Sequence, residues 1–205
     1  MNITAIKAQV KNTERVSVFV EGVFSFSLSL SELVSTGLKN GVELTEHDID
    51  QYKKLSMIGK KRMKLLNWVT LRPRSSGELK IYIKMKLSLD KTLLSDEEKQ
   101  GLETEMITRG YVDDTRFAEW WLSRRTSQAK SKQRLSSELM QKGINRQLIA
   151  EQVQGLDNDL ALTSQIRKHA GKTKYRSDPK KFIAYLMRQG FSYSDITAAL
   201  EAAGE

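Results

Sequence analysis

One local pattern occurs twice in the last third of this chain, and it constrains the fold more than any other feature. A helical segment ends at a glycine, an apolar residue and a polar helix-capping residue follow, and a second helical segment begins. At a shift of 47 residues the two copies coincide at eight positions: Leu135 with Phe182, Leu139 with Leu186, Met140 with Met187, Gly143 with Gly190, Ile144 with Phe191, Asn145 with Ser192, Ile149 with Ile196 and Val153 with Leu200. Because the glycines match together with the residues on either side of them, the sequence predicts a tandem helical repeat.

A further copy is predicted upstream, with a longer connection. Its matching residues lie 56 positions before the next copy in one helix (Leu79, Ile83) and 47 positions before it in the next (Leu102, Met106). The difference implies a nine-residue insertion after Lys86, and Leu87 stands where the other copies have glycine. The sequence therefore predicts a mainly α fold of three tandem three-helix repeats (51–110, 111–156 and 157–205) in an elongated array, with an insertion near 87–101.

Residues 1–50 follow a different pattern, in which apolar and polar residues alternate. One alternating run precedes Glu21-Gly22 and another follows it: Val16, Val18 and Val20, then Phe24, Phe26, Leu28 and Leu30. Alternation on both sides of a two-residue turn is typical of a β-hairpin with one buried face. Ile3 to Gln9 can add a third strand, and a short helix is expected from about Ser31 to Gly37. We predict a small β-rich N-terminal domain.

Capping residues mark the expected helix starts. The signatures are Thr45 with Asp48, Ser75 with Glu78, Ser95 with Glu98, Asp178 before Pro179, and Ser192 with Asp195. Asp113 and Asp114 form a similar start, as an N-cap and a first-turn acid, rather than a catalytic carboxylate pair. On the helix that follows, Phe117 and Trp121 are expected in the core, whereas Trp120 lies off their line and could contact a partner or a base.

The charge is distributed unevenly. The net charge is +9, yet residues 1–50 contain 4 Lys and Arg against 7 Asp and Glu, and the remainder contains 30 against 18. Between residues 53 and 91, 12 basic residues stand against Glu78 and Asp90 alone. This asymmetry favours a polyanionic partner over a merely solvated lysine-rich surface.

Basic residues recur near the junction between the first and second helices of each predicted repeat. A basic track of this kind suits a phosphate backbone, or a DNA–protein filament, better than a base-reading site. We expect nucleic-acid or filament contacts from Arg72, Arg74, Lys80, Lys84, Arg124, Arg125, Lys130, Lys132, Arg134, Lys142, Lys180, Lys181 and Arg188.

Residue types that most catalytic and metal sites need are scarce. There is no cysteine, and His47 and His169 are far apart, which argues against a zinc site. Gly59-Lys60-Lys61 lacks the upstream glycine and strand of a phosphate-binding loop. We expect no enzymatic activity, catalytic residue, cofactor, metal or small-molecule substrate. The longest apolar run has five residues and no secretory signal is recognisable, so a cytoplasmic protein without a membrane partner is expected.

Several strings resemble those of the RecX family, the modulators of the RecA recombinase. The central one is Gly110-Tyr111-Val112-Asp113-Asp114-Thr115-Arg116-Phe117-Ala118, which is similar to the family signature Gly-Tyr-x-Asp-Asp-x-x-Phe-Ala. Similar strings in the family's order are Arg72-Pro73-Arg74-Ser75 with Glu78-Leu79, Arg134-Leu135 to Gly143-Ile144, and Leu186 to Ile196. The N-terminal segment resembles the extra domain of longer members. The segment 87–101 departs from the family pattern.

The resemblance implies a non-enzymatic regulator of homologous recombination and DNA repair, including the SOS response. Such a protein would bind the RecA–DNA filament, inhibit or modulate ATP hydrolysis and strand exchange, and bind single- and double-stranded DNA without strong sequence preference. One alternative is a sequence-specific helix-turn-helix repressor, although helix starts such as Asn145-Arg146-Gln147-Leu148 are poor in groove-reading arginine. Another is an adaptor whose basic surface binds an acidic protein.

Overall fold

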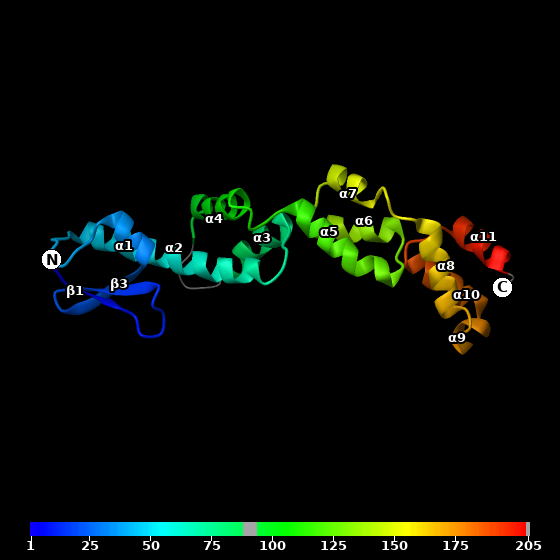
Figure 1. The fold of residues 1–205 in the computed structure, drawn as a ribbon, viewed down its shortest axis with the longest axis horizontal. Helices are drawn as coiled ribbons and strands as arrows, with labels where there is room; N and C mark the ends of the chain where they lie inside the picture. The colour runs from blue at the N-terminus through cyan, green and yellow to red at the C-terminus, as the bar shows by residue number, and fades with distance from the viewer. Residues whose placement is uncertain (88–93, 204–205) are drawn as a thin grey trace. The chain divides into compact units, whose positions relative to one another are not determined.

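The computed structural model describes residues 1–87 and 94–203. Three strands come first and helices follow (Figure 1). The elements are β1 (Ile3–Ala8), β2 (Arg15–Val20), β3 (Val23–Ser29), α1 (Leu30–Thr36), α2 (Glu46–Thr70), α3 (Ser76–Tyr82), the π-helical turn η1 (Ile83–Leu87), α4 (Asp96–Thr108), α5 (Asp114–Arg125), the 3-10 turn η2 (Thr126–Gln128), α6 (Lys132–Gln141), α7 (Arg146–Val153), α8 (Asn158–His169), α9 (Thr173–Arg176), α10 (Pro179–Arg188) and α11 (Tyr193–Ala203). The prediction of a mainly α fold with a small N-terminal sheet is confirmed.

The chain forms two compact units, and each is described by itself. The N-terminal unit contains Met1–Leu71 and Tyr82–Met106, and the C-terminal unit contains Arg72–Ile81 and the residues from Ile107 onward. The predicted boundaries of the three repeats stay a prediction. The predicted insertion near 87–101 lies partly in segment 88–93, outside the described residues.

The sheet is an antiparallel meander in the order β1-β2-β3. Val16, Val18 and Val20 are buried, as the alternation predicted, and they form a core with Phe26 and Leu28. The same core includes Ile49 of α2, so this helix covers the sheet.

The prediction that Phe24 and Leu30 share the buried face is wrong. Phe24 is 52% exposed and Leu30 is 43% exposed. The pairing of β2 with β3 shifts between Val18 and Phe19, where Phe24 rather than Ser25 lies opposite Phe19. Such a bulge inserts one residue and turns the neighbouring side chain to the other face. Leu30 is already the first residue of α1.

The expected helix caps are confirmed. The hydroxyl of Thr45 accepts a hydrogen bond from the Asp48 amide, and the Asp48 carboxylate accepts one from the Thr45 amide. The same reciprocal contacts join Ser95 and Glu98. Asp113 caps α5 by accepting from the amide of Arg116, and Phe117 on the following turn is fully buried.

Equivalent positions in the two C-terminal copies have equivalent burial. The buried members are Leu135, Leu139, Ile144 and Ile149 in one copy and Phe182, Leu186, Phe191 and Ile196 in the other. Met140 and Met187, which also align, are 48% and 49% exposed. Gly143 and Gly190 both have left-handed backbones, with φ of 82° and 91°. The sequence repeat is therefore also a structural repeat.

A contact between successive copies is repeated as well. The hydroxyl of Ser75, before α3, donates to the carbonyl of Lys142 at the end of α6, with 2.6 Å between the oxygens. The hydroxyl of Ser131, before α6, donates to the carbonyl of Gln189 at the end of α10, at 2.9 Å. Ser75 and Ser131 lie 56 residues apart, and Lys142 and Gln189 lie 47 apart, as in the sequence alignment. Each second helix thus begins against the end of the corresponding helix in the next copy.

The start of each second helix also receives a polar side chain from the next copy. The carboxylate of Asp114 in α5 accepts from the backbone amide and the hydroxyl of Ser76, both at 2.7 Å. The side-chain oxygen of Asn158 in α8 accepts from the amide of Lys132 at 3.0 Å. Free amides at a helix start need an acceptor, so these side chains join the copies where water would otherwise bind.

Candidate nucleic-acid and filament interface

Trp120 lies between two arginines in the C-terminal unit. The guanidinium carbons of Arg72 and Arg124 are each 5.1 Å from the centre of its ring. Trp120 is partly buried and packs against the core around Phe117, so its ring is held in place. A guanidinium over an indole face is attracted by the ring's π electrons. The expectation that Trp120 could be available to a partner is therefore modified, because arginines contact the ring within the protein itself.

Trp121 holds a second pair of cations. The guanidinium carbon of Arg125 and the ammonium nitrogen of Lys142 lie 4.5 and 5.2 Å from the ring centre. The indole nitrogen donates to the carboxylate of Glu138 at 3.2 Å. Trp121 is partly buried beside Phe117, as the helical spacing predicted. The two tryptophans therefore position cations that come from three segments of the chain.

Glu138 gathers three predicted site residues around one carboxylate. The Lys130 ammonium lies 2.7 Å from it, and the guanidiniums of Arg134 and Arg125 lie at 3.4 and 3.7 Å. The Glu138 side chain is only 12% exposed. Because the pairing is partly buried, it orders these side chains more strongly than surface ion pairs do.

Glu78 has the same role at the junction between copies. It accepts two hydrogen bonds from the Arg72 guanidinium, at 2.9 and 3.1 Å, and one from the Lys142 ammonium at 3.0 Å. A bidentate pair of this kind fixes the direction of the guanidinium. Arg72, from before α3, and Lys142, from the end of α6, are thus brought together by tertiary structure alone.

We name this group the basic–aromatic cluster. Its six basic side chains surround two carboxylates and two indoles, so it keeps a net positive charge. Its members are Arg72, Glu78, Trp120, Trp121, Arg124, Arg125, Lys130, Arg134, Glu138 and Lys142. A cluster of fixed cations beside aromatic rings is chemically suited to phosphate and to acidic protein surfaces.

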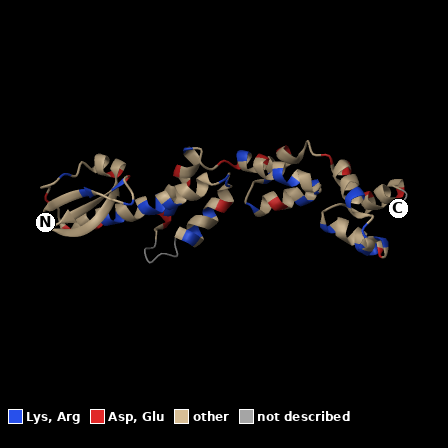
Figure 2. Ribbon diagram, turned by 60° about the horizontal axis from the view of Figure 1, so that its bottom comes forward, with Lys and Arg blue, Asp and Glu red and all other residues tan. Residues whose placement is uncertain are grey.

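The remaining predicted residues lie elsewhere. Arg74 is only 9% exposed, so its side chain is not presented to a partner at this surface. The Lys132 ammonium donates to the carbonyl of Gln154 at 3.1 Å. Five other predicted residues are exposed: Lys80 on α3, Lys84 on η1, and Lys180, Lys181 and Arg188 on α10. Figure 2 shows blue Lys and Arg segments recurring along the helices, with red acidic segments between them.

Local sequence patterns do not reveal that Glu78 and Glu138 organise the cluster. Glu78 was predicted as a helix-cap residue and as part of a family string, and Glu138 lies within the string from Arg134 to Ile144. A usable signal was present, because a single acid surrounded in sequence by Lys130, Arg134 and Lys142 is unusual in a basic segment. Lys142, which approaches Glu78 from the end of α6, is however 64 positions away.

We predict that acid weakens this cluster. Burial raises the pKa of Glu138, but the hydrogen bond and charge of Lys130 outweigh it, and the pKa lies below the ordinary 4.5. Burial likewise raises the pKa of Glu78, but the hydrogen bonds and charges of Arg72 and Lys142 lower it by more. The pKa of Glu78 therefore also lies below its ordinary value. A lowered pKa in the folded state stabilises the protein above pH 4.5, and this stabilisation is lost as the pH falls through the lowered value.

Urea unfolding from pH 7 to about pH 3 measures the effect. The double variant Glu78→Gln/Glu138→Gln is expected to be less stable than the parent at pH 7 and to approach it at low pH. Glu119→Gln, an exposed change on α5, serves as the control. A stability gap that stays constant across the pH range would contradict the prediction.

Within the described residues, no group of three or more His, Cys, Asp and Glu side chains could hold a metal ion. No helix in the described part of the chain is both long and apolar enough to span a bilayer.

Solved structures resemble this fold closely. A crystal structure titled as regulatory protein RecX superposes with a TM-score of 0.74, at 19% identity, and the match covers 98% of each chain. The crystal structure of RecX from Lactobacillus salivarius gives a TM-score of 0.57 at 19% identity, over 71% of this chain and 96% of the other. The fold therefore defines the class: a mainly helical protein with a small three-stranded antiparallel sheet at its N-terminus.

Sequence comparisons place the chain more narrowly. Residues 1–45 match the RecX N-terminal domain, and residues 113–151 match the second three-helix domain of RecX. Regulatory protein RecX of Bacillus pumilus is 32% identical over 212 residues, covering 98% of this chain and 77% of the relative. That of Listeria innocua is 28% identical over 214 residues, covering 100% and 77%. This chain belongs to the RecX family of regulatory proteins, and the predicted resemblance is confirmed.

Proposed function

We propose that this protein regulates a RecA-type recombinase by binding the RecA–DNA filament, and that it lowers ATP hydrolysis and strand exchange without catalysing a reaction itself. Membership in a family of regulatory proteins supports a regulatory role. The site proposed for the filament is the basic–aromatic cluster together with the exposed basic residues of α10. Binding of single- and double-stranded DNA without strong sequence preference, in recombination and DNA repair, is part of the proposal.

The observation that carries the proposal is the repeated contact between successive copies. Ser75 and Ser131 make the same hydrogen bond to the end of a helix in the next copy. Units joined by the same contact can present similar surfaces in succession. A helical filament also repeats its surface, so successive units can contact successive protomers.

The deciding experiment follows ATP hydrolysis by RecA on single-stranded DNA after adding the full chain at substoichiometric amounts. We expect the rate to fall, because one bound regulator would affect several neighbouring protomers. The variant Arg124→Glu/Lys181→Glu, which reverses two exposed charges of the proposed site, is expected to lose most of the inhibition. The variant Lys11→Glu/Lys39→Glu has the same change in charge at exposed residues outside that site and is expected to inhibit normally. An unchanged rate with the unmodified protein would refute the proposal.

The helix-turn-helix alternative gains no specific support from the turn geometry. In the turn between α6 and α7, Gly143 lies against Gly77 of α3, so this turn is used for contact between copies. Preference for one duplex sequence over a scrambled one in a binding assay would favour that alternative.

A further inference from the structure

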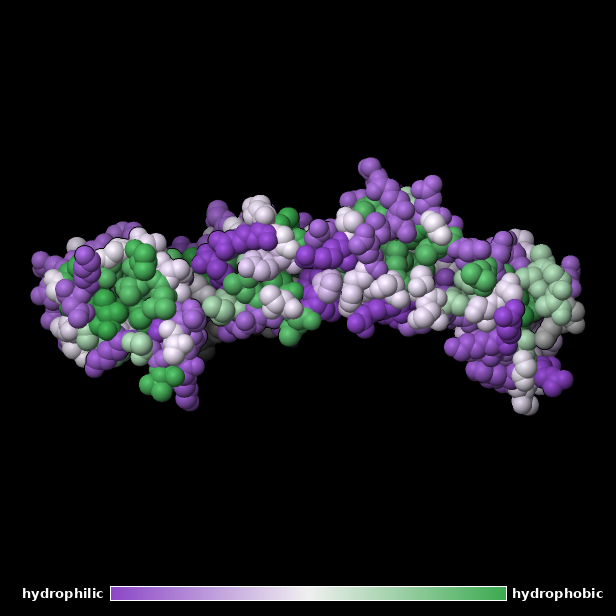
Figure 3. All heavy atoms as spheres, viewed as in Figure 1, coloured by the Kyte–Doolittle hydropathy of each residue, from purple (hydrophilic) through white to green (hydrophobic). Residues whose placement is uncertain are grey.

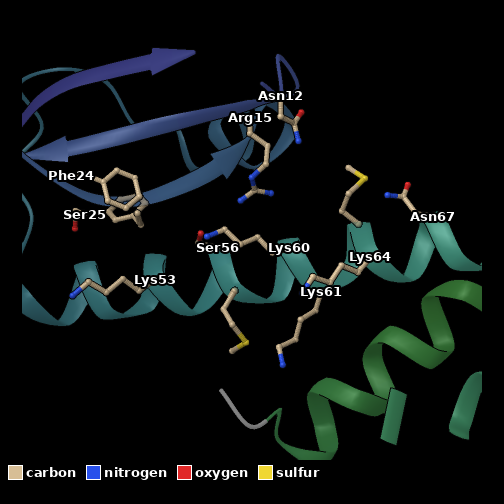
Figure 4. A pocket seen from close by; sticks show the side chains of 13 residues that line it. Asn12, Arg15, Phe24, Ser25, Lys53, Ser56, Lys60, Lys61, Lys64 and Asn67 are labelled. Atoms are coloured by element: carbon tan, nitrogen blue, oxygen red, sulfur yellow. The ribbon is translucent and has the colours of Figure 1, made fainter. Parts of the chain in front are cut away.

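The N-terminal unit contains a hollow that the predicted basic track does not include. It has a volume of about 530 Å³ and lies between the sheet and α2 (Figure 4). Its basic lining residues are Arg15 from the sheet and Lys53, Lys60, Lys61 and Lys64 from α2, and none of the described residues that line it is acidic. The volume falls in the range of small-ligand sites, and the lining charge selects an anion.

Arg15 gives the strongest reason to expect that anion. Arg15 is only 5% exposed, and one terminal nitrogen of its guanidinium donates to the carbonyl and the hydroxyl of Ser27, at 2.9 and 3.3 Å. Its buried Nε has no hydrogen-bond partner within residues 1–87 and 94–203. Among the described residues no carboxylate pairs with this guanidinium. A buried charge without a counterion costs free energy, which an anion in the hollow would offset.

The lysines of α2 divide between two faces of the helix. Lys54 pairs with Glu98 at 2.9 Å, and Arg62 pairs with Glu105 at 2.7 Å, so these charges are balanced within the unit. Lys60 and Lys64, one turn apart, line the hollow, and Figure 4 shows Lys60 lying along α2 below Arg15. Part of the basic stretch found in the sequence thus lies at one site.

Phe24 adds an aromatic ring to the rim. The β-bulge described above places it on the exposed side of β3, and its side chain lines the hollow. On the view in Figure 3, green hydrophobic atoms gather over the part of the N-terminal unit that contains the sheet. An exposed ring next to cations can stack on an unpaired base, which a duplex does not offer.

We propose that this hollow binds one segment of single-stranded nucleic acid. Lys60 and Lys64 contact phosphate oxygens, the buried charge of Arg15 adds electrostatic attraction, and Phe24 stacks on a neighbouring base. The N-terminal unit as a whole contains 14 basic and 13 acidic residues, so attraction is local to the hollow and does not extend over a surface wide enough for a duplex. This inference rests on the nucleic-acid binding included in the proposed function.

The test measures binding of a fluorescein-labelled oligothymidylate to the full chain by anisotropy, from about 50 to 200 mM salt. Lys60→Glu/Lys64→Glu is expected to weaken binding at least about tenfold at low salt. Since each phosphate contact on a single strand contributes about 0.7 to the slope of log affinity against log salt, the slope should become shallower by about 1.4. Phe24→Ala should weaken binding about tenfold with an unchanged slope, because stacking releases no counterions. Lys11→Glu/Lys39→Glu is the charge-matched control.

Thermal unfolding of each variant verifies that it is folded. Equal binding by Lys60→Glu/Lys64→Glu and the control variant would overturn the inference while leaving the proposed function intact. Absence of oligonucleotide binding by the unmodified chain would overturn both this inference and the DNA part of the proposed function.

Two other ligands test the single-strand assignment. The affinity for a duplex of the same length should be unaffected by Phe24→Ala. Unlabelled thymidine monophosphate and unlabelled oligothymidylate can each be used to displace the labelled oligonucleotide. If both displace it equally well at the same phosphate concentration, the hollow is an isolated anion site and the single-strand assignment is wrong.

Discussion

Replacing Gly77 by alanine is expected to destabilise the protein by about 3 kcal/mol, although the same replacement normally stabilises a helix. Gly77 lies in the first turn of α3, where it meets the end of α6. A β-carbon built on Gly77 would lie 2.4 Å from the carbonyl oxygen of Lys142 and 2.8 Å from the α-carbon of Gly143. Both neighbours are backbone atoms, so the contact between the copies must open to admit a methyl group.

Gly101 of α4 provides the matched control. A β-carbon there would have no atom of the described residues within 4 Å, and its backbone is helical. Gly101→Ala is therefore expected to stabilise the protein by about 0.5–1 kcal/mol through helix propensity. Urea unfolding of the two variants should show free-energy changes of opposite sign. If both variants are stabilised, the close backbone approach at Gly77 is wrong.

Loss of the Phe117 ring is expected to cost about 3–5 kcal/mol in the free energy of unfolding. Phe117 is fully buried in the core that α5, α6 and α7 share. Its ring centre lies 5.8 Å from those of both Trp120 and Trp121. Phe117→Ala would leave a cavity beneath the two indoles, and the four cations that lie over them would lose their fixed positions.

Two measurements check this prediction. Urea unfolding gives the stability, with Met140→Ala as a control, because Met140 is 48% exposed and its truncation should change stability by about 0.5 kcal/mol or less. Near-ultraviolet circular dichroism reports on the tryptophan environment in the folded variant. A stability loss below about 1 kcal/mol would show that Phe117 is not the support of the cluster that its burial implies.

Most of the secondary structure could be predicted from local patterns. The caps at Thr45, Ser95 and Asp113 depend on contacts within four residues, and all three form as expected. Alternation in the hairpin predicted the buried valines, but it did not predict the exposure of Phe24. The bulge that exposes Phe24 depends on how two strands pair, which an alternating pattern does not specify.

The candidate site could be predicted only as a list of basic residues. Arg72 and Arg74 are two positions apart in the sequence, and both were predicted to contact nucleic acid or the filament. In the structure Arg72 forms a bidentate pair with Glu78, whereas Arg74 is buried. Residue type alone does not distinguish the two arginines, because the burial of a side chain is set by tertiary packing.

By itself the sequence determined the helical repeat, the N-terminal hairpin, the left-handed glycines and the family, because each depends on neighbours close along the chain or on residue order. Tertiary structure alone decided which cations pair with carboxylates and which ones line the hollow. Glu78 meets Lys142 from 64 positions away, and Arg15 meets the lysine face of α2 across the hollow. Electrostatic pairing and desolvation depend on distances in space, and only the folded chain sets those distances.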